Sequence, residues 1–466
     1  MKINSKVFGV LFLLTMVAVA CNKDFITSPT VQEKTFIENN DMTFVSASKA
    51  NKIAEGFFGT LSNDPVTKSS IRLASTETIV DRRNENKPLM YVMNYADGGF
   101  VIISATKDYY PVLAYSDEGT FDLSEDMGSV AVWLEETEEA IRQSKTLDKK
   151  IKAKISSMWR RYDPTGNIIS HKATTKSLSS EKDDAMANRI GELTNMGYTC
   201  YSLESAYTEG LISYNLYQAS LTNAYELGTP EYPIVVFGNN YSFSQIGPLV
   251  STHWEQQNSY NALCSNYPGP AGCGTIAIAQ IMKFHEFPST YDWSGMADIF
   301  ATNATQILIR DINNRIGSGS YVNEEQSAFQ YFGYNATVYN HDRQSVESEL
   351  FYHRPILMGG YTNSLLGIGI GDGHSWVCDG VSKEYSENFH YVEFLIGDSG
   401  DYYYDYDKNI CAPNNPIYTG GYVSEYFHMN WGWNSSATPD GWFATNDVNT
   451  VLGNFNHVRK NIYVSK

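Results

Sequence analysis

GPAGCGTIAIAQIMKF, residues 269–284, joins a turn of small residues to a run that is apolar on every side. The run meets no breaker before Pro288 and therefore predicts a buried helix that begins at Cys273. At a helix N-terminus, unpaired backbone N–H groups and the helix dipole favour the thiolate, which is the reactive form of cysteine. Gly272 and Gly274 leave room beside the sulfur for a substrate backbone. A buried structural cysteine near a helix start is the alternative interpretation.

A second element, GDGHSWVCDG at 371–380, delivers His374 at the start of a predicted strand. Alternation places His374, Trp376 and Cys378 on one face of that strand, and Gly380 is predicted to end it. A base at the start of a strand can reach a helix N-terminus in another part of the fold, so His374 is the candidate base for the thiol. A packed or surface histidine is the alternative, because the chain has nine histidines in all.

Two further segments supply polar groups of the kind that such a pair needs. A predicted strand at 428–434 carries Asn430, which could accept the imidazole N–H and fix its tautomer, and Trp431, which could shield that bond. Upstream, the amide of Gln256 could join the backbone N–H of the nucleophile in holding a developing oxyanion. Gln257 remains open as the donor, and a tryptophan-rich core strand remains open for 428–434.

These segments occur in a fixed order along the chain and together resemble the streptopain family of papain-like cysteine peptidases, over residues 246–466. The resemblance implies an α+β fold with a helical half and an antiparallel-sheet half. It implies no metal and no cofactor. The site residues that it implies are Cys273 as nucleophile, His374 as base, Asn430 and Trp431 as the orienting pair, Gln256 as oxyanion donor, and Trp431 and Gly272 at the substrate cleft.

The N-terminal part of the chain predicts a compact α+β domain of its own. Helical spacing over 43–57 is followed by two β-prone runs, Met90–Met93 and Phe100–Ser104, on either side of an Asp-Gly-Gly turn that is typical of a hairpin. A third strand follows at Val112–Tyr115, and residues 132–161 have a helical pattern. This segment resembles the propeptide of the same family, so residues 22–162 are expected to form an inhibitory propeptide domain.

Between the two domains, residues 163–245 are predicted to be a linker and activation region. The stretch 167–185 is polar and poor in bulky apolar residues, which is typical of an exposed, easily cleaved segment, whereas 186–245 is ambiguous. A Tyr- and Asp-rich insertion at 382–424 lengthens the distance from His374 to Asn430 beyond what the family resemblance leads us to expect. Both departures leave the substrate range and the cleavage position open.

The N-terminus has the parts of a secretory signal, which we assign to residues 1–21. Lys2 and Lys6 precede the apolar run 7–20, which ends in small residues at Cys21. The position of Cys21 resembles the acylated cysteine of bacterial lipoproteins, although an ordinary signal with a chance cysteine is the alternative. We therefore expect an exported protein, either an outer-membrane or cell-surface lipoprotein tethered through acylated Cys21, or a secreted one.

Composition narrows the classes of function. The 466-residue chain carries a formal net charge of −18, which argues against a nucleic-acid partner. Its six cysteines form no CxxC pair and no metal-ligand spacing, although a Cys378–Cys411 disulfide stays open. The expected function is hydrolysis of protein or peptide substrates by a cysteine endopeptidase made as a zymogen. A cell-wall Cys-His amidase and a catalytically silent binding protein on a peptidase fold are the alternatives.

Overall fold

The fold is given by a computed structural model of the whole chain. The structure describes residues 41–61, 72–84, 86–123, 127–162, 181–317, 322–361, 364–365, 368–369, 373–396, 401–403, 416–432, 439–445 and 459–466. The predicted signal segment and its Cys21 therefore lie outside the described residues. Among the described helices, none combines the length and the hydropathy needed to cross a membrane.

The N-terminal domain packs three helices against an antiparallel sheet. Its elements are α2 Ala47–Leu61, β1 Leu73–Asp81, β2 Lys87–Tyr95, β3 Phe100–Ser104, β4 Val112–Ser116, α3 Val130–Gln143 and α4 Lys149–Tyr162. The predicted hairpin is confirmed as β2 and β3, which pair antiparallel from Met90 with Ser104 to Asn94 with Phe100. Gly98 and Gly99 in its turn have positive φ angles of 95° and 88°, a conformation that favours glycine.

The single helical pattern predicted over 132–161 is two helices in the structure. A short 3-10 turn at Ser144–Thr146 ends α3, and Leu147 follows in an extended conformation with its side chain buried. Asp148 then caps α4, because its side chain accepts a hydrogen bond from the Ile151 N–H at 2.8 Å. The polar caps Ser144 and Asp148 explain the break, which the continuous helical spacing concealed.

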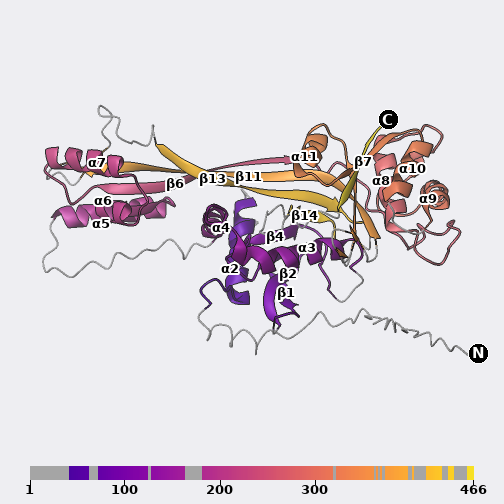
Figure 1. Ribbon diagram of the computed structural model, residues 1–466, viewed down its shortest axis with the longest axis horizontal. Coiled ribbons are helices and arrows are strands. Elements are labelled where there is room, and N and C mark those ends of the chain that lie inside the picture. The colour runs from indigo at the N-terminus through magenta and orange to yellow at the C-terminus, as the bar shows by residue number, and fades with distance from the viewer. Residues whose placement is uncertain are drawn as a thin grey trace, which may run out of the picture.

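The C-terminal half combines a helical layer with the long strands of a shared sheet (Figure 1). Its helices are α8 Cys273–His285, α9 Asn303–Ile316, α10 Val322–Tyr331 and α11 Arg343–Phe351. Its strands are β7 Asn335–Asn340, β8 Ile356–Tyr361, β9 Ser364–Leu365, β10 Ile368–Gly369, β11 Gly373–Leu395, β12 Tyr402–Tyr403, β13 Ile417–Asn430, β14 Gly441–Ala444 and β15 Lys460–Ser465. An α+β fold with helical and antiparallel-sheet halves is therefore present, as the sequence predicted.

One sheet runs through both domains. Its strand order is β1-β2-β3-β4-β14-β13-β11-β8-β15-β7, so the propeptide-like sheet joins the C-terminal sheet where β4 meets β14. That junction pairs Tyr115 with Trp442 and Ala114 with Phe443. The apolar residues of the two domains form one continuous core on this face of the sheet. The N-terminal domain is thus packed directly on the strands that carry the candidate site.

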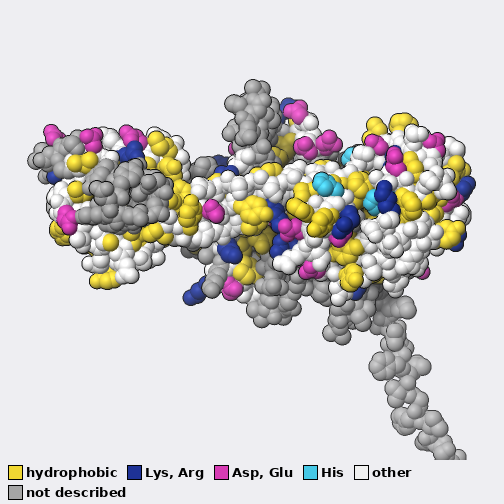
Figure 2. All heavy atoms as spheres, turned by 90° about the horizontal axis from the view of Figure 1, so that it is seen from above, with side chains coloured by type: hydrophobic (Ala, Val, Ile, Leu, Met, Phe, Trp, Pro, Cys, Tyr) yellow, Lys and Arg dark blue, Asp and Glu magenta, His cyan; other side chains and the backbone are white. Residues whose placement is uncertain are grey.

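A third unit lies at the far end of the long strands, opposite the helices α8 to α10 (Figures 1 and 2). Its elements are α5 Glu181–Asn195, β5 Thr199–Ser202, α6 Leu203–Thr208, α7 Tyr214–Glu226 and β6 Ile234–Ile246. We call residues 181–246, with the ends of β11 and β13 that they cover, the distal lobe. It has its own apolar core. Strand β6 pairs with β11 from Ile234 with Glu393 to Ile246 with Val381.

The distal lobe changes the interpretation of two predicted regions. Residues 181–245, which the sequence assigned to a linker and activation region, are largely helix and strand, and only 163–180 of that region lie outside the described residues. The predicted insertion at 382–424 supplies the distal ends of β11 and β13. Gly380 does not end its strand. It marks a bulge between Cys378 and Gly380, where a Cβ would lie 2.9 Å from the His428 Cβ.

Candidate active site

Cys273 is the first residue of helix α8, as the sequence predicted. The helix is preceded by Gly272 at a φ of 97°, a conformation that other residues rarely adopt. The turn is fixed from both sides, because the Ala271 N–H donates to the Gln256 carbonyl at 2.8 Å and the Ala271 carbonyl accepts from Asn313 at 2.9 Å. The sulfur therefore stands at the positive end of a buried helix, where an anion is stabilised.

The structure brings the start of β11 to this sulfur. The backbone N–H of Ser375 donates to the Cys273 Sγ at 3.4 Å, which places His374, the preceding residue, beside the helix N-terminus. His374 is half-buried and pairs with Gly360 on β8. Residues 102 positions apart in sequence thus meet at one point. The candidate thiol and its candidate base are therefore carried by elements that touch at this point.

Asn430 ends β13, and both the oxygen and the nitrogen of its amide take part in a buried hydrogen-bond network. Its Oδ1 accepts from Gln280 Nε2 at 2.8 Å, and its Nδ2 donates to the Thr252 carbonyl at 2.7 Å. An amide oxygen can accept a second donor, so the Oδ1 retains capacity for an imidazole N–H. The network fixes the orientation of the amide before any histidine contacts it.

Gln280 is a site residue that the sequence reasoning missed. Its side chain is completely buried in α8, and its Oε1 accepts from the Thr252 hydroxyl and from the Trp254 N–H, each at 3.1 Å. It therefore links the helix that carries the thiol to the strand that carries Asn430 and to the segment that leads to Gln256. A polar residue in a helix that is otherwise apolar on every side was the available signal.

The structure distinguishes the two neighbouring glutamines. The Gln256 side chain is buried with 5% exposure, whereas Gln257 is exposed. Among the described residues, the Gln256 Nε2 has no hydrogen-bond partner. A buried amide donor without a partner is unfavourable unless it serves a ligand. That state suits a group that donates to an oxyanion during the reaction.

Trp431 follows Asn430 and is completely buried against aromatic rings. Its ring lies edge-on to Phe443 at 4.9 Å and tilted against Trp376 at 5.3 Å between centroids. The Trp431 N–H donates to Asp440 at 2.9 Å, and the same carboxylate contacts the His253 Nδ1 at 2.9 Å. That hydrogen bond raises the pKa of His253, and through Asp440 it ties the two segments together.

Three other described cysteines are free and buried: Cys200, Cys264 and Cys378. Burial raises the pKa of the Cys264 and Cys378 thiols, and it raises the pKa of Cys200 to about 12. Such thiols stay protonated and unreactive at neutral pH. Cys411, the partner that the sequence left open for Cys378, lies outside the described residues. The described residues contain no group of three or more acidic, histidine or cysteine side chains that could hold a metal ion.

Helix α3 of the N-terminal domain lies over the start of β11, the strand that carries His374. The Ser129 hydroxyl, just before α3, donates to the Ser375 carbonyl at 3.1 Å. One turn later, the Trp133 indole N–H donates to the Ala444 carbonyl at 3.1 Å. The Trp133 ring also packs edge-on against Phe443 at 5.0 Å. These residues are spaced to lie on one face of the helix.

The same helix face ends in a buried ion pair. Glu136 on α3 contacts Arg459, which precedes β15, and the Arg459 Nε donates to the Glu136 Oε1 at 3.1 Å. Arg459 is 1% exposed and Glu136 is 8% exposed. The guanidinium also lies over the Trp376 ring, 5.5 Å from its centroid. Breaking such a pair leaves a buried charge uncompensated, which is strongly unfavourable.

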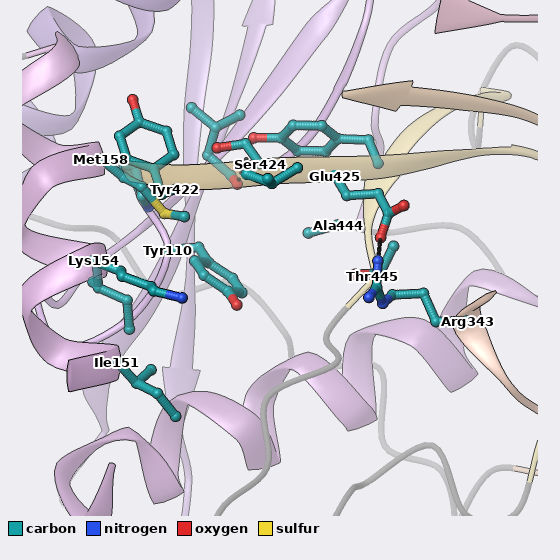
Figure 3. Close-up of a pocket in the computed structure, with 15 residues that line it drawn as sticks. Tyr110, Ile151, Lys154, Met158, Arg343, Tyr422, Ser424, Glu425, Ala444 and Thr445 are labelled. Atoms are coloured by element: carbon teal, nitrogen blue, oxygen red, sulfur yellow. Dashed lines mark hydrogen bonds and ion pairs between the residues drawn. The ribbon is translucent and has the colours of Figure 1, made fainter. Parts of the chain in front are cut away.

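A pocket of about 320 Å³ lies farther along the boundary between the two domains (Figure 3). Helix α4 supplies Ile151, Lys154 and Met158 to its wall. Strand β13 supplies Tyr422 and Glu425, and the latter pairs with Arg343 in Figure 3. Neither Cys273 nor His374 lines it. The pocket therefore belongs to the domain boundary and not to the candidate active site.

Comparison with known proteins gives matches in both the N-terminal domain and the C-terminal half. Residues 42–141 match the family model described as Spi protease inhibitor, and residues 254–313 match the Peptidase C10 family. Streptopain from Streptococcus pyogenes is 23% identical over 336 residues, which cover 68% of this chain and 74% of the relative, and the serotype M1 streptopain gives the same values. A prointerpain A fragment from Prevotella intermedia matches with a TM-score of 0.41 and 17% identity, over 83% of this chain and 98% of that one. The chain is accordingly a cysteine endopeptidase that resembles streptopain, with a segment similar to the peptidase C10 family and an N-terminal domain similar to Spi protease inhibitor.

Proposed function

We propose that Cys273 and His374 form the catalytic pair of this peptidase. His374 takes the thiol proton, the thiolate attacks the substrate carbonyl carbon, and the imidazolium returns the proton to the leaving amine. The Gln256 Nε2 and the Cys273 N–H stabilise the oxyanion, and water then hydrolyses the thioester to free the acid and the thiol. The 3.4 Å contact of the Ser375 N–H with the Cys273 Sγ carries this assignment, because it joins the helix start to the histidine strand.

Asn430 is assigned an orienting role. Its amide is held by Gln280 at 2.8 Å and by the Thr252 carbonyl at 2.7 Å, so it offers the imidazole a fixed acceptor. An acceptor for one ring N–H leaves the other nitrogen free to exchange a proton with the thiol. Trp431, buried beside this amide, excludes water from the bond. Trp431 and Gly272 stay assigned to the substrate cleft.

The precursor is held inactive by α3. Ser129 contacts Ser375, the neighbour of His374, and Trp133 contacts β14 of the same sheet. An extended substrate cannot reach a strand face that a helix already covers. Cutting the connection between α4 and α5, at residues 163–180, is the step that permits release. The sequence-based prediction of a cut within 163–245 is narrowed by the fold of the distal lobe, because helix and strand resist proteolysis.

The cellular location of the protein is proposed from its N-terminal sequence. A basic start, the apolar run 7–20 and Cys21 have the form of a lipoprotein signal. We assign the protein to export, as an outer-membrane or cell-surface lipoprotein anchored through acylated Cys21, or as a secreted protein. Labelling with a radioactive fatty acid, compared between wild type and Cys21→Ser, tests the anchor, and an equal signal in both would refute it.

The catalytic assignment is tested with purified precursors. Cys273→Ser precursor is incubated with a trace of processed wild type, and the new N-terminus is mapped. Processed Cys273→Ser should neither hydrolyse casein nor react with an epoxide inhibitor. Processed Cys264→Ser and Cys378→Ser should hydrolyse casein and react with the inhibitor as wild type does. Full activity in Cys273→Ser would refute the assignment. Activity on cell-wall peptides without activity on casein would favour an amidase, and binding without hydrolysis in the wild type would favour a silent peptidase fold.

A further inference from the structure

On the sheet face that carries His374, residues on three adjacent strands lie in a row that ends at the cation of Arg459. His374 on β11 pairs with Gly360 on β8, and the β8–β15 register, with Gly359 opposite Lys460, puts Arg459 opposite Gly360. Residues opposite one another in a sheet project to the same face. At about 4.8 Å between strands, Arg459 stands roughly 10 Å from His374. Gly360 has no side chain, so nothing of its own fills the space between them.

In the precursor, α3 fills that space. A Cβ on Gly360 would lie 2.7 Å from the Val132 Cγ1 and 3.3 Å from the Trp376 ring, so Val132 occupies the gap that the glycine leaves. Four residues later on the same helix face, Glu136 pairs with Arg459. An apolar group next to the histidine is thus followed by a carboxylate at the arginine. We call the strip formed by Gly360, Trp376 and Arg459 the arginine lane.

Removal of the N-terminal domain takes both occupants away. Arg459 is fixed by its chain, because its backbone carbonyl accepts from the His341 N–H at 3.0 Å, and its guanidinium keeps the Trp376 ring beneath it. A guanidinium stacked on an indole, beside an apolar surface, can bind another carboxylate once Glu136 has left. The α3 side chains show what such a ligand looks like: aliphatic near His374 and acidic at the far end.

We propose that the arginine lane is a substrate subsite of the mature peptidase and that Arg459 selects an acidic side chain, glutamate above all. The inference rests on the proposed function and adds a substrate preference to it. An extended chain advances about 3.3 Å per residue, so the selected residue lies within about three positions of the scissile bond. We expect glutamate to be preferred over aspartate, because the longer side chain carries its carboxylate past the apolar part of the arginine lane to Arg459. The Glu136 contact of the precursor is then a substrate-like contact made by the protein's own helix.

The test uses processed wild-type enzyme and a set of fluorogenic peptides. Each position within three residues of the scissile bond is set in turn to Glu, Gln or Lys. At one position we expect kcat/KM for Glu to exceed that for Gln by about tenfold or more, the usual effect of a hydrogen-bonded charge pair. The Arg459→Gln enzyme, made with Glu136→Gln so that the precursor folds without an unpaired charge, should lose this ratio. Arg459→Glu should reverse it in favour of Lys.

Lys460→Gln is the matched control, because Lys460 neighbours Arg459 but projects to the other face and contacts Asn340. It should keep the wild-type Glu to Gln ratio. Hydrolysis with no acidic preference at any position, or a preference unchanged in the Arg459→Gln enzyme, would overturn the arginine lane and leave the proposed function intact. A processed enzyme that cleaves none of the peptides would overturn the proposed function and, with it, this proposal.

Discussion

Replacing Trp133 by alanine should release activity from the uncut precursor. The Trp133 side chain is completely buried, donates to the Ala444 carbonyl at 3.1 Å, and packs on Phe443 at 5.0 Å, both in the C-terminal half. Truncating a buried tryptophan costs about 3 kcal/mol or more. Each 1.4 kcal/mol changes an equilibrium about tenfold. The undocked fraction of α3 should therefore rise at least about 100-fold. The hydrolysis rate of the uncut precursor should rise with it, up to the rate of the mature enzyme.

The chain offers a matched control in Trp159. Its indole N–H also donates to a backbone carbonyl, that of Tyr109 at 2.7 Å, but both residues belong to the N-terminal domain. Trp159→Ala therefore removes the same kind of ring together with a hydrogen bond that stays within the N-terminal domain. Both variants should lower the melting temperature of the precursor. Only Trp133→Ala should raise activity at temperatures where the N-terminal domain remains folded.

The assay measures initial hydrolysis of a short fluorogenic peptide by single-chain precursor, with gels run at each time point to show that no cut has occurred. Circular dichroism of the same samples reports whether the N-terminal domain is folded. If uncut Trp133→Ala hydrolyses the peptide as slowly as uncut wild type, docking of α3 is not what inhibits the precursor. If Trp159→Ala releases as much activity at equal folded fraction, the contact with Ala444 and Phe443 has no special role.

Two further outcomes follow from the site and its cover. Asn430→Ala should lower kcat, but by less than the roughly 10⁴-fold that a wrong histidine tautomer costs in a serine triad. Gln280→Ala should lower kcat by a similar factor, and the double variant should lose no more than either single one. Fully additive losses in the double variant would refute a shared role of the two residues. Burial raises the pKa of Glu136 from its ordinary 4.5 to about 7, against the opposing effect of Arg459. Between about pH 4.5 and 7 the docked Glu136 is therefore a neutral carboxyl that still accepts a hydrogen bond from Arg459, whereas the undocked carboxyl is ionised. Docking is strongest below about pH 4.5 and weakens over that range by at most about tenfold per pH unit, and the charged ion pair with Arg459 forms at higher pH. Hydrogen exchange of α3 in Cys273→Ala precursor should show protection falling over that range, and Glu136→Gln should remove the dependence; the opposite slope would refute the argument.

The elements that carry the candidate site were predictable because their signals are local. A helix that is apolar on all sides and meets no breaker before Pro288 identified α8 and its first residue, and a glycine-flanked histidine identified the start of β11. Gln280 was not predictable in the same way. Its role depends on Thr252 and Asn430, which meet it only in the folded chain.

The distal lobe was missed for the same physical reason on a larger scale. Strand β6 carries few apolar residues beyond Phe237, and its long pairing partner, β11, comes about 150 residues later in the chain. Neither local periodicity nor turn chemistry reports a partner at that distance. The tyrosine-rich composition of 382–424 could be read as an insertion, but only pairing showed that it continues the strands that carry His374 and Asn430.

Cutting the chain and freeing the site are separate events in this architecture. A cut between α4 and α5 breaks one covalent connection, yet it leaves β4 paired with β14, α3 seated on the His374 strand and Glu136 paired with Arg459. Strand β14 lies between β4 and β13, so loss of the N-terminal domain turns it into a sheet edge and uncovers Trp442 and Phe443. Both consequences oppose dissociation, because they expose apolar surface and unpaired backbone groups. Cleaved precursor should therefore stay largely inactive until the N-terminal domain that is still bound to it is degraded. The stability of that domain, and not the first cut alone, then controls activity.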